Sequence, residues 1–108
     1  MEAKLFRLDE LKPRELAPGV RVRFVHSEHI TVAHWIFAAG APLREHSHPH
    51  EQITNIIEGE FEMTVGGETL RLGPRSVVII PPNVVHSGRA LSRTYALDVF
   101  YPLREDYR

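Results

Sequence analysis

The chain has 108 residues, of which 43% are hydrophobic and 25% charged, and its formal net charge is −1. This size predicts a single domain, residues 1–108, with a real hydrophobic core, and the near-neutral charge gives no reason to expect a nucleic-acid partner. The lack of cysteine excludes disulfides and thiolate sites. It also fits a reducing compartment, so we expect a cytoplasmic protein. No apolar run reaches the roughly 20 residues that span a membrane, so no membrane partner is expected.

The first part of the chain is expected to form a short N-terminal arm, residues 1–19, ahead of a β-barrel, residues 20–108. Leucines at near-helical spacing in the arm predict one or two helical turns, which prolines at positions 13 and 18 keep short. The charged opening stretch does not resemble a signal peptide. Strict alternation in the segment 20–25 (VRVRFV) predicts a half-buried strand, and residues 30–40 (ITVAHWIFAAG) predict a second.

The residue pattern in the rest of the chain predicts further short strands joined by turns. Residues 53–72 predict strands separated by a turn at Gly59 and a hairpin at Gly66-Gly67. The segment 76–81 (SVVIIP) hardly alternates, which predicts burial on both faces, and residues 93–102 predict the last strand. About eight short strands without a long helix predict an all-β sandwich or barrel. Its expected core includes Trp35, Phe37, Phe61 and Met63.

Histidines are concentrated in residues 40–59, GAPLREHSHPHEQITNIIEG. Side chains two positions apart share one face of a strand, so His46 and His48 are expected to point the same way and share one ion. Pro49 tends to end a strand, which lets the chain turn and bring Gln52 back toward the same point. A fourth ligand is needed from elsewhere, and His86 in IPPNVVHSG is the best candidate. The sequence therefore predicts a metal site inside a small β-barrel.

Three imidazoles and one amide oxygen form a neutral ligand set, which indicates the chemistry of the predicted site. Such a set accepts one divalent transition metal per chain, with nickel, manganese, iron and zinc all candidates. Because no ligand is charged, the ion keeps its full positive charge and acts as a stronger Lewis acid toward a bound carboxylate or carbonyl oxygen. Tetrahedral zinc held by all four groups would be closed and structural. His50 is an alternative to Gln52 as a ligand, although it is expected at the rim.

These residues carry a family resemblance. The spacing of glycine, histidine and glutamine in residues 40–59 resembles the first motif of the cupin superfamily, with Gln52 where glutamate is usual. Residues 81–86 (PPNVVH) resemble the second motif, with Asn83 where glycine is common and Arg75 in place of the leading glycine. The resemblance implies a double-stranded β-helix, or jelly-roll barrel, with the metal inside its mouth.

A narrower resemblance joins HSHPHEQ, IPPNVVHSG and residues 98–107 (DVFYPLREDY) to small bacterial cupins of the pectin-degradation type. That family promotes conversion of unsaturated uronates to linear keto forms. The resemblance implies that Asp98 and Arg104 are the catalytic or substrate-contacting pair and that Phe100 lines the pocket. The substrate it implies is a small anionic molecule.

The residue types fit that chemistry. Ketonisation moves a proton from an enol oxygen to carbon, and the carboxyl group of Asp98 can exchange such a proton. The planar guanidinium of Arg104 can hold a uronate carboxylate. The alternative is that Asp98 pairs with an arginine at the barrel rim and that Arg104 is a solvated tail residue. His34, beside Trp35, is either a hydrogen-bonded barrel histidine or a substrate contact.

Three functions remain open on the sequence. The first is a metal-dependent isomerase-type enzyme that ketonises an unsaturated uronate or a similar small sugar acid. The second is an iron- or manganese-dependent dioxygenase, and the third is a metal-binding or ligand-binding module without turnover. A lone barrel has exposed strand edges that the arm of a neighbour can cover, and small cupins are often dimers, so we expect a homodimer.

Overall fold

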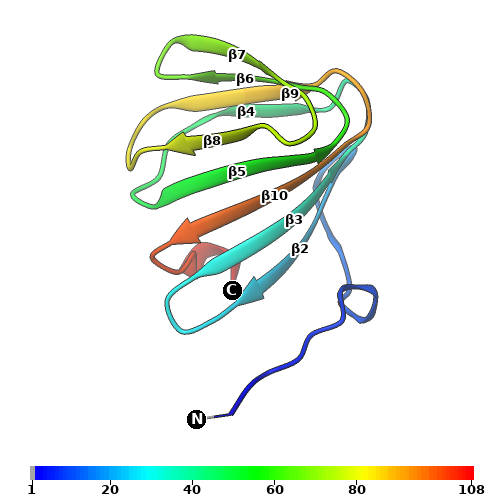
Figure 1. Cartoon of the computed structure of the whole chain (residues 1–108), viewed down its shortest axis with the longest axis vertical. Helices are drawn as coiled ribbons and strands as arrows, with labels where there is room; N and C mark the ends of the chain where they lie inside the picture. The colour runs from blue at the N-terminus through cyan, green and yellow to red at the C-terminus, as the bar shows by residue number, and fades with distance from the viewer. Residues whose placement is uncertain (1) are drawn as a thin grey trace.

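The computed structural model describes residues 2–108, which fold into two antiparallel β-sheets and two short 3₁₀ turns (Figure 1). The six-stranded sheet has the order β1 (Arg14–Ala17), β2 (Val20–His26), β3 (Thr31–Phe37), β10 (Thr94–Tyr101), β5 (Glu51–Glu58) and β8 (Val77–Ile80). The four-stranded sheet has the order β4 (Pro42–His46), β9 (His86–Ala90), β6 (Phe61–Val65) and β7 (Glu68–Leu72). The turns are η1 (Leu8–Glu10) and η2 (Glu105–Tyr107), and neither helical turn in the described chain has the length to cross a bilayer. The all-β jelly-roll prediction is confirmed.

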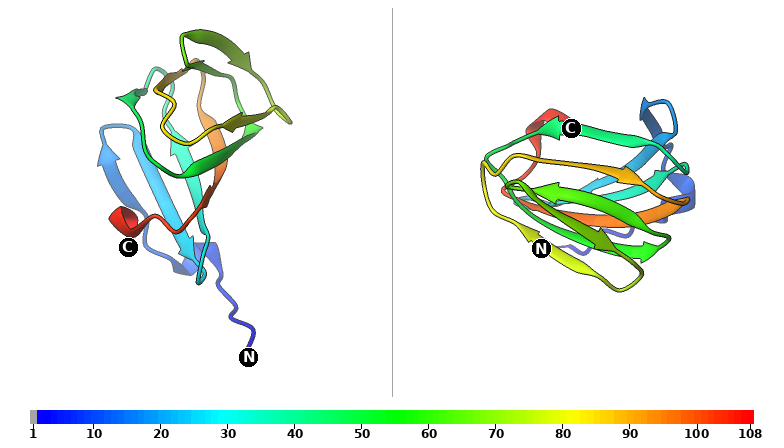
Figure 2. Two further views of the ribbon diagram at one scale, coloured as in Figure 1. Left: turned by 90° about the vertical axis from the view of Figure 1, so that its left-hand side faces the viewer. Right: turned by 90° about the horizontal axis from the view of Figure 1, so that it is seen from above.

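The core lies between the two sheets, which curve around it when the molecule is seen from above (Figure 2). Strand β3 shows why: burial alternates along it, so that Ala33, Trp35 and Phe37 point inward. Phe37 meets Phe61 of the opposite sheet with ring centroids 5.0 Å apart. Met63 is also buried, so the predicted core residues are confirmed.

The N-terminal arm differs from the prediction. It forms a single 3₁₀ turn at Leu8–Glu10 rather than one or two full helical turns, and residues Arg14–Ala17 pair with β2 as strand β1. Pro13 stands directly before this strand and stops any helix from continuing. The Arg23 guanidinium donates to the carbonyl of Leu11 at 2.9 Å, which ties the arm to the sheet. The first residues extend away from the barrel (Figure 1).

The prediction that residues 76–81 are buried on both faces is wrong. Val77 and Ile79 are 60% and 62% exposed, whereas Ile80 is fully buried. Strand β8 lies at the edge of the six-stranded sheet, and no other part of residues 2–108 covers its outward face. In this protein the unbroken apolar run therefore belongs to an edge strand that has one buried face and one exposed face.

The tight turns follow the sequence. Gly59 and the Gly66-Gly67 pair have positive φ angles, as predicted for the turn and the hairpin. Asn83 adopts φ 66°, in the left-handed region that asparagine tolerates. Arg75, which stands in place of the leading glycine of the second motif, adopts φ 73°, so an arginine supplies that left-handed turn.

Gly59→Ala is expected to destabilise the fold far more than Gly67→Ala. Both glycines have φ near 90° (+90° and +86°), so alanine costs about 1–2 kcal/mol at either site. At Gly59 a Cβ would also lie 2.2 Å from the carbonyl oxygen of Arg93, whereas at Gly67 it would meet nothing within 4 Å. The total at Gly59 is therefore about 3–4 kcal/mol. Urea unfolding measures both, and equal losses would contradict the close approach at Gly59.

Candidate metal centre

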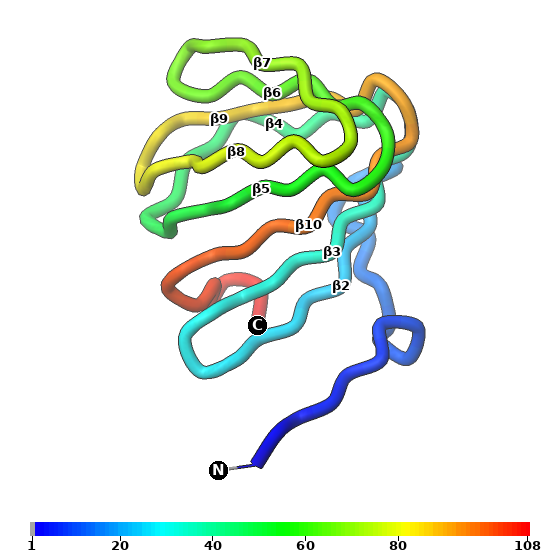
Figure 3. Tube along the Cα trace, in the orientation of Figure 1, coloured from blue at the N-terminus to red at the C-terminus, as the bar shows by residue number. Residues whose placement is uncertain are grey.

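Three histidines converge at one end of the barrel. His46 ends β4 and is the register partner of His86, which begins β9, and these two strands run side by side (Figure 3). His48 lies in the loop after β4, so the expectation that His46 and His48 share one strand is wrong. The chain leaves the strand two residues before Pro49, yet the three rings still meet. Their potential ligand atoms all lie within 4.8 Å of one another.

The three imidazoles are held in one tautomer by the main chain. In each ring Nδ1 faces a carbonyl oxygen, which can only accept, so Nδ1 carries the proton and Nε2 keeps a free lone pair. The acceptors are Arg44 O for His46 (2.7 Å), His50 O for His48 (3.1 Å) and Val84 O for His86 (2.9 Å). Such contacts orient histidine ligands at metal sites.

Gln52 lies beside the three histidines, where the sequence predicts the fourth group. It begins the buried face of β5, and its Oε1 lies 3.0 Å from His48 Nε2. Its amide nitrogen donates to Thr54 Oγ1 at 2.9 Å and to Asp98 Oδ2 at 3.2 Å, which turns the amide oxygen toward the histidines. Two acceptors, the amide oxygen and an unprotonated Nε2, therefore face each other.

A bound cation would resolve that conflict. Buried His86 Nε2 also has no hydrogen-bond partner within residues 2–108, and a buried lone pair without a partner is costly. Burial lowers the pKa of His48 to about 4, and Arg104 adds to this effect. Burial also lowers the pKa of His86. Both rings are thus neutral near pH 7, the form that binds metal, and the ligand set fits a divalent transition metal.

Asp98 lies on β10, directly behind Gln52. It is 7% exposed, its Oδ2 accepts from the Gln52 amide, and its Oδ1 has no hydrogen-bond partner in the described part of the chain. Burial raises the pKa of Asp98 to about 6, and the polar groups of Thr54 and Trp35 offset only part of this. Two positions along the same inward face, the Phe100 ring lies 5.6 Å from the ring of His48.

Arg104 is buried, not a solvated tail residue. Its main-chain N–H donates to Thr31 Oγ1 at 2.9 Å. Its guanidinium binds both carboxylate oxygens of Asp106, at 3.0 and 2.7 Å. The same group stacks on the rings of Phe100 and Tyr107, 4.7 and 4.1 Å from their centroids. Its predicted contact with a substrate carboxylate stays a prediction, since Asp106 already engages the Nε and Nη2 groups.

His34 and His50 are not part of the cluster. Because Ala33 and Trp35 point into the barrel, His34 points outward, where its Nδ1 lies 2.8 Å from the Tyr95 hydroxyl. This placement argues against the predicted substrate contact of His34, since the outer face of the sheet does not line the site. His50 sits at the rim beside His48, outside the three-histidine group, as expected.

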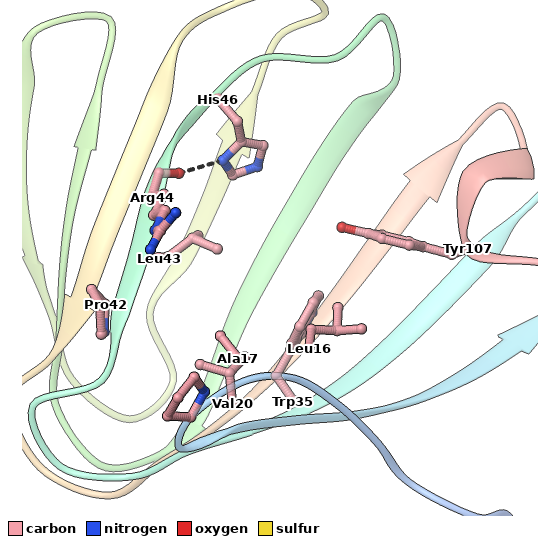
Figure 4. Close-up of a pocket in the computed structure, with 10 residues that line it drawn as sticks. Leu16, Ala17, Val20, Trp35, Pro42, Leu43, Arg44, His46 and Tyr107 are labelled. Atoms are coloured by element: carbon pink, nitrogen blue, oxygen red, sulfur yellow. Dashed lines mark hydrogen bonds between the residues drawn. The ribbon is translucent and has the colours of Figure 1, made fainter.

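A cavity of about 630 Å³ opens beside His46 (Figure 4). The two sheets, the arm and the C-terminal segment all contribute to its wall. The lining residues are Leu16, Ala17, Pro18, Val20, Trp35, Pro42, Leu43, Arg44, His46 and Tyr107. In the close-up the hydroxyl of Tyr107 points toward the side of the cavity where His46 and Leu43 lie.

Residues 33–100 match the family model described as the cupin domain. The chain belongs to the cupin family. This stretch contains all three histidines and Gln52, so the family assignment rests on the part of the molecule that forms the site.

Similar proteins span nearly the whole cupin. The uncharacterized protein SCO3923 of Streptomyces coelicolor is 31% identical over 101 residues, 92% of this chain and 96% of that protein. The structure of KdgF from Halomonas sp. is 27% identical and has a TM-score of 0.93, covering 99% of this chain and 100% of that one. An RmlC-like cupin from Shewanella frigidimarina is 23% identical with a TM-score of 0.93, covering 99% and 97%, and supports the fold.

Sequence reasoning missed the cavity wall of this cupin. No functional role was predicted for Tyr107, and Leu16 lies in a segment that was expected to be an arm. The one signal for Tyr107 was its place in the segment that resembles pectin-degradation cupins. Leu16 had no signal, because its role depends on the pairing of β1 with β2.

Proposed function

We propose that this cupin is a metal-dependent enzyme that ketonises an unsaturated uronate or a similar small sugar acid. The observation that supports it best is the convergence of three unprotonated Nε2 atoms and the Gln52 oxygen beside an open cavity. A divalent ion bound there would act as a Lewis acid toward an oxygen of the substrate. The neutral set His46, His48, Gln52 and His86 would hold it without reducing its charge.

The chain's own residues would handle the proton. Ketonisation removes a proton from the enol oxygen and adds one to the far carbon of the enol double bond, while the carbon that bears the oxygen becomes a carbonyl, so no oxidant or reductant is consumed. Asp98 is suited to carry that proton, because its Oδ1 is buried and lacks a partner within residues 2–108. Phe100 keeps water from this side of the site. Arg104, held between two aromatic rings, would attract the substrate's carboxylate.

The uronate assignment has two supports. One is the resemblance of residues 46–52, 80–88 and 98–107 to pectin-degradation cupins, which places Asp98, Phe100 and Arg104 in that family's positions. The other is the similarity over nearly the full chain to the structure of KdgF from Halomonas sp.. Neither separates a uronate from other acids with the same carboxylate and enol groups, so the substrate itself must be assayed.

The test is turnover with defined metals. Protein stripped of metal and reloaded with nickel, manganese, iron or zinc is mixed with unsaturated uronate, with and without oxygen, and the products are identified by NMR. We expect a linear keto product, independent of oxygen and dependent on metal. Oxygen consumption with ring or chain cleavage would instead indicate a dioxygenase. Tight metal and ligand binding with no product would indicate a binding module.

We also propose that the cupin is a homodimer that pairs through the outer face of its six-stranded sheet. Val77 and Ile79 of β8 and Ile57 of β5 lie on that face and are exposed. An antiparallel sheet that faces water normally carries polar residues there, and exposed apolar edge strands associate readily. A second copy would cover these residues.

Ile79→Lys is expected to raise the dimer dissociation constant at least about tenfold, because a charge would be buried in an apolar contact. Ile30→Lys is the matched control, since Ile30 is also exposed but lies at the β2–β3 turn. Sedimentation velocity over a concentration series measures both. A dimer unaffected by Ile79→Lys would move the interface elsewhere, and Leu5→Lys would then test the arm.

A further inference from the structure

The cavity beside the candidate metal centre is mainly apolar. Seven of its ten lining residues are aliphatic, proline or tryptophan. The polar exceptions are Arg44, His46 and Tyr107. His46 belongs to the metal centre, and Tyr107 brings its hydroxyl into the space from the opposite side (Figure 4). The hydroxyls of a sugar would find few partners against such walls, and unpaired polar groups in a cavity are costly.

The size of the cavity also favours a ligand with an apolar body. A volume of about 630 Å³ lies within the range of sites for whole small molecules. A carboxylate and an adjoining enol or keto oxygen fill only a small part of it. The remaining space is bounded by Trp35, Leu43 and Leu16, which offer apolar surface and no charge.

Several contacts hold Tyr107 in place in the cavity wall. Its ring packs against Phe24 with centroids 4.4 Å apart and against the Arg104 guanidinium at 4.1 Å. Its main-chain carbonyl accepts from Arg14 Nη2 at 2.6 Å. Strand β1, which carries Leu16, is hydrogen-bonded to β2 on the other side of the opening. The cavity wall is therefore held by contacts of Tyr107 and by the pairing of β1 with β2.

We infer that this cavity binds the apolar body of a 2-oxo or enol acid whose carboxylate and neighbouring oxygen lie at the histidine cluster. The inference rests on the proposed function, because it assigns a substrate class to the same site. A sugar acid would use only the head position, with its hydroxyls toward the open mouth. An acid with a branched aliphatic or aromatic body fills the cavity as well, and the Tyr107 hydroxyl donates to one of its oxygens.

The test compares two acids with the same head. Pyruvate and 4-methyl-2-oxopentanoate are titrated into metal-loaded protein, and binding is followed by calorimetry and by fluorescence of Trp35, the only tryptophan. Burying the additional carbons is expected to strengthen binding of the branched acid at least about tenfold. Affinities within about threefold of each other, or no change in Trp35 fluorescence, would overturn the inference.

Two variants test whether the preference for the branched acid arises in the cavity. Leu16→Asp puts a carboxylate on the rim of the wall, where the side chain is already 47% exposed, and should abolish the preference for the branched acid. Metal content should stay unchanged. Leu5→Asp, at an exposed position outside the cavity, should keep the preference. A preference that survives Leu16→Asp would place the apolar site elsewhere and overturn the inference.

The two proposals fail in different ways. If the branched acid is preferred and unsaturated uronate is not ketonised, the proposed reaction is wrong and the cavity assignment stands. If uronate is turned over and the two acids bind alike, the cavity assignment is wrong and the reaction stands. Both readouts use the same metal-loaded protein, so metal content is equal in the comparison.

Discussion

His46→Ala is expected to lower the affinity of the protein for a divalent transition metal at least about a hundredfold. Loss of a group that only orients a ligand costs about 10- to 100-fold, and loss of the ligand itself should cost no less. His46 is the most exposed of the three histidines, so its removal should leave the barrel folded. Competition with a chromogenic chelator measures the affinity, and circular dichroism checks the fold.

His50→Ala is the matched control for that measurement. His50 is two residues from His48 and its ring lies beside that of His48, but its side chain is outside the three-histidine group, and its hydrogen bond with His48 is made by its main-chain carbonyl. Alanine retains that carbonyl, so metal affinity should stay within about threefold, a change of less than 1 kcal/mol. Equal losses in the two variants would show that the ion is bound by a different set of residues.

Asp98→Asn is expected to lower turnover at least about a hundredfold while metal content stays the same. The amide keeps the shape of the side chain but cannot exchange the proton, and general acid–base groups contribute about 10²–10⁴-fold. The variant should be at least as stable as the parent, because it removes a buried charge whose Oδ1 has no partner within residues 2–108. Steady-state kinetics, elemental analysis and thermal unfolding measure the three quantities.

Asp106→Asn serves as its control. Asp106 is the carboxylate that binds the Arg104 guanidinium, yet it is partly exposed and makes no contact with Gln52. Its loss should change turnover much less than the loss of Asp98. Full activity in Asp98→Asn would remove Asp98 from the mechanism, and a parallel drop in metal content would make its role structural.

The ligand cluster was predictable because the spacing of its residues along the sequence indicates which side chains can meet. His46, His48 and Gln52 lie within seven residues, and His86 stands in a second recognisable motif. Their convergence did not depend on the exact end of β4. For this reason the site prediction agrees with the structure even though His48 is in a loop and not on the strand.

The wrong predictions share one cause. They depend on how the strands pack in the folded chain, which the sequence of a single strand does not show. His34 and Trp35 are neighbours, and which of them faces the barrel depends on the partner sheet. The apolar run in β8 cannot reveal that the strand lies at an edge. For Arg104 the sequence left a substrate contact and a solvated tail residue both open, and only the folded chain shows Phe100 and Tyr107 against its guanidinium.

The carbonyl contacts to the three imidazole Nδ1 atoms have a consequence for how the protein would acquire a metal ion. Since the rings are already oriented by Arg44, His50 and Val84, loading demands little rearrangement of the surrounding barrel. Selection among metals would then rest on how well each ion's preferred geometry fits the fixed rings, and on the supply of metals in the growth medium, rather than on raw affinity. Protein purified from cells grown with different metals would then contain different bound ions but have nearly the same backbone structure.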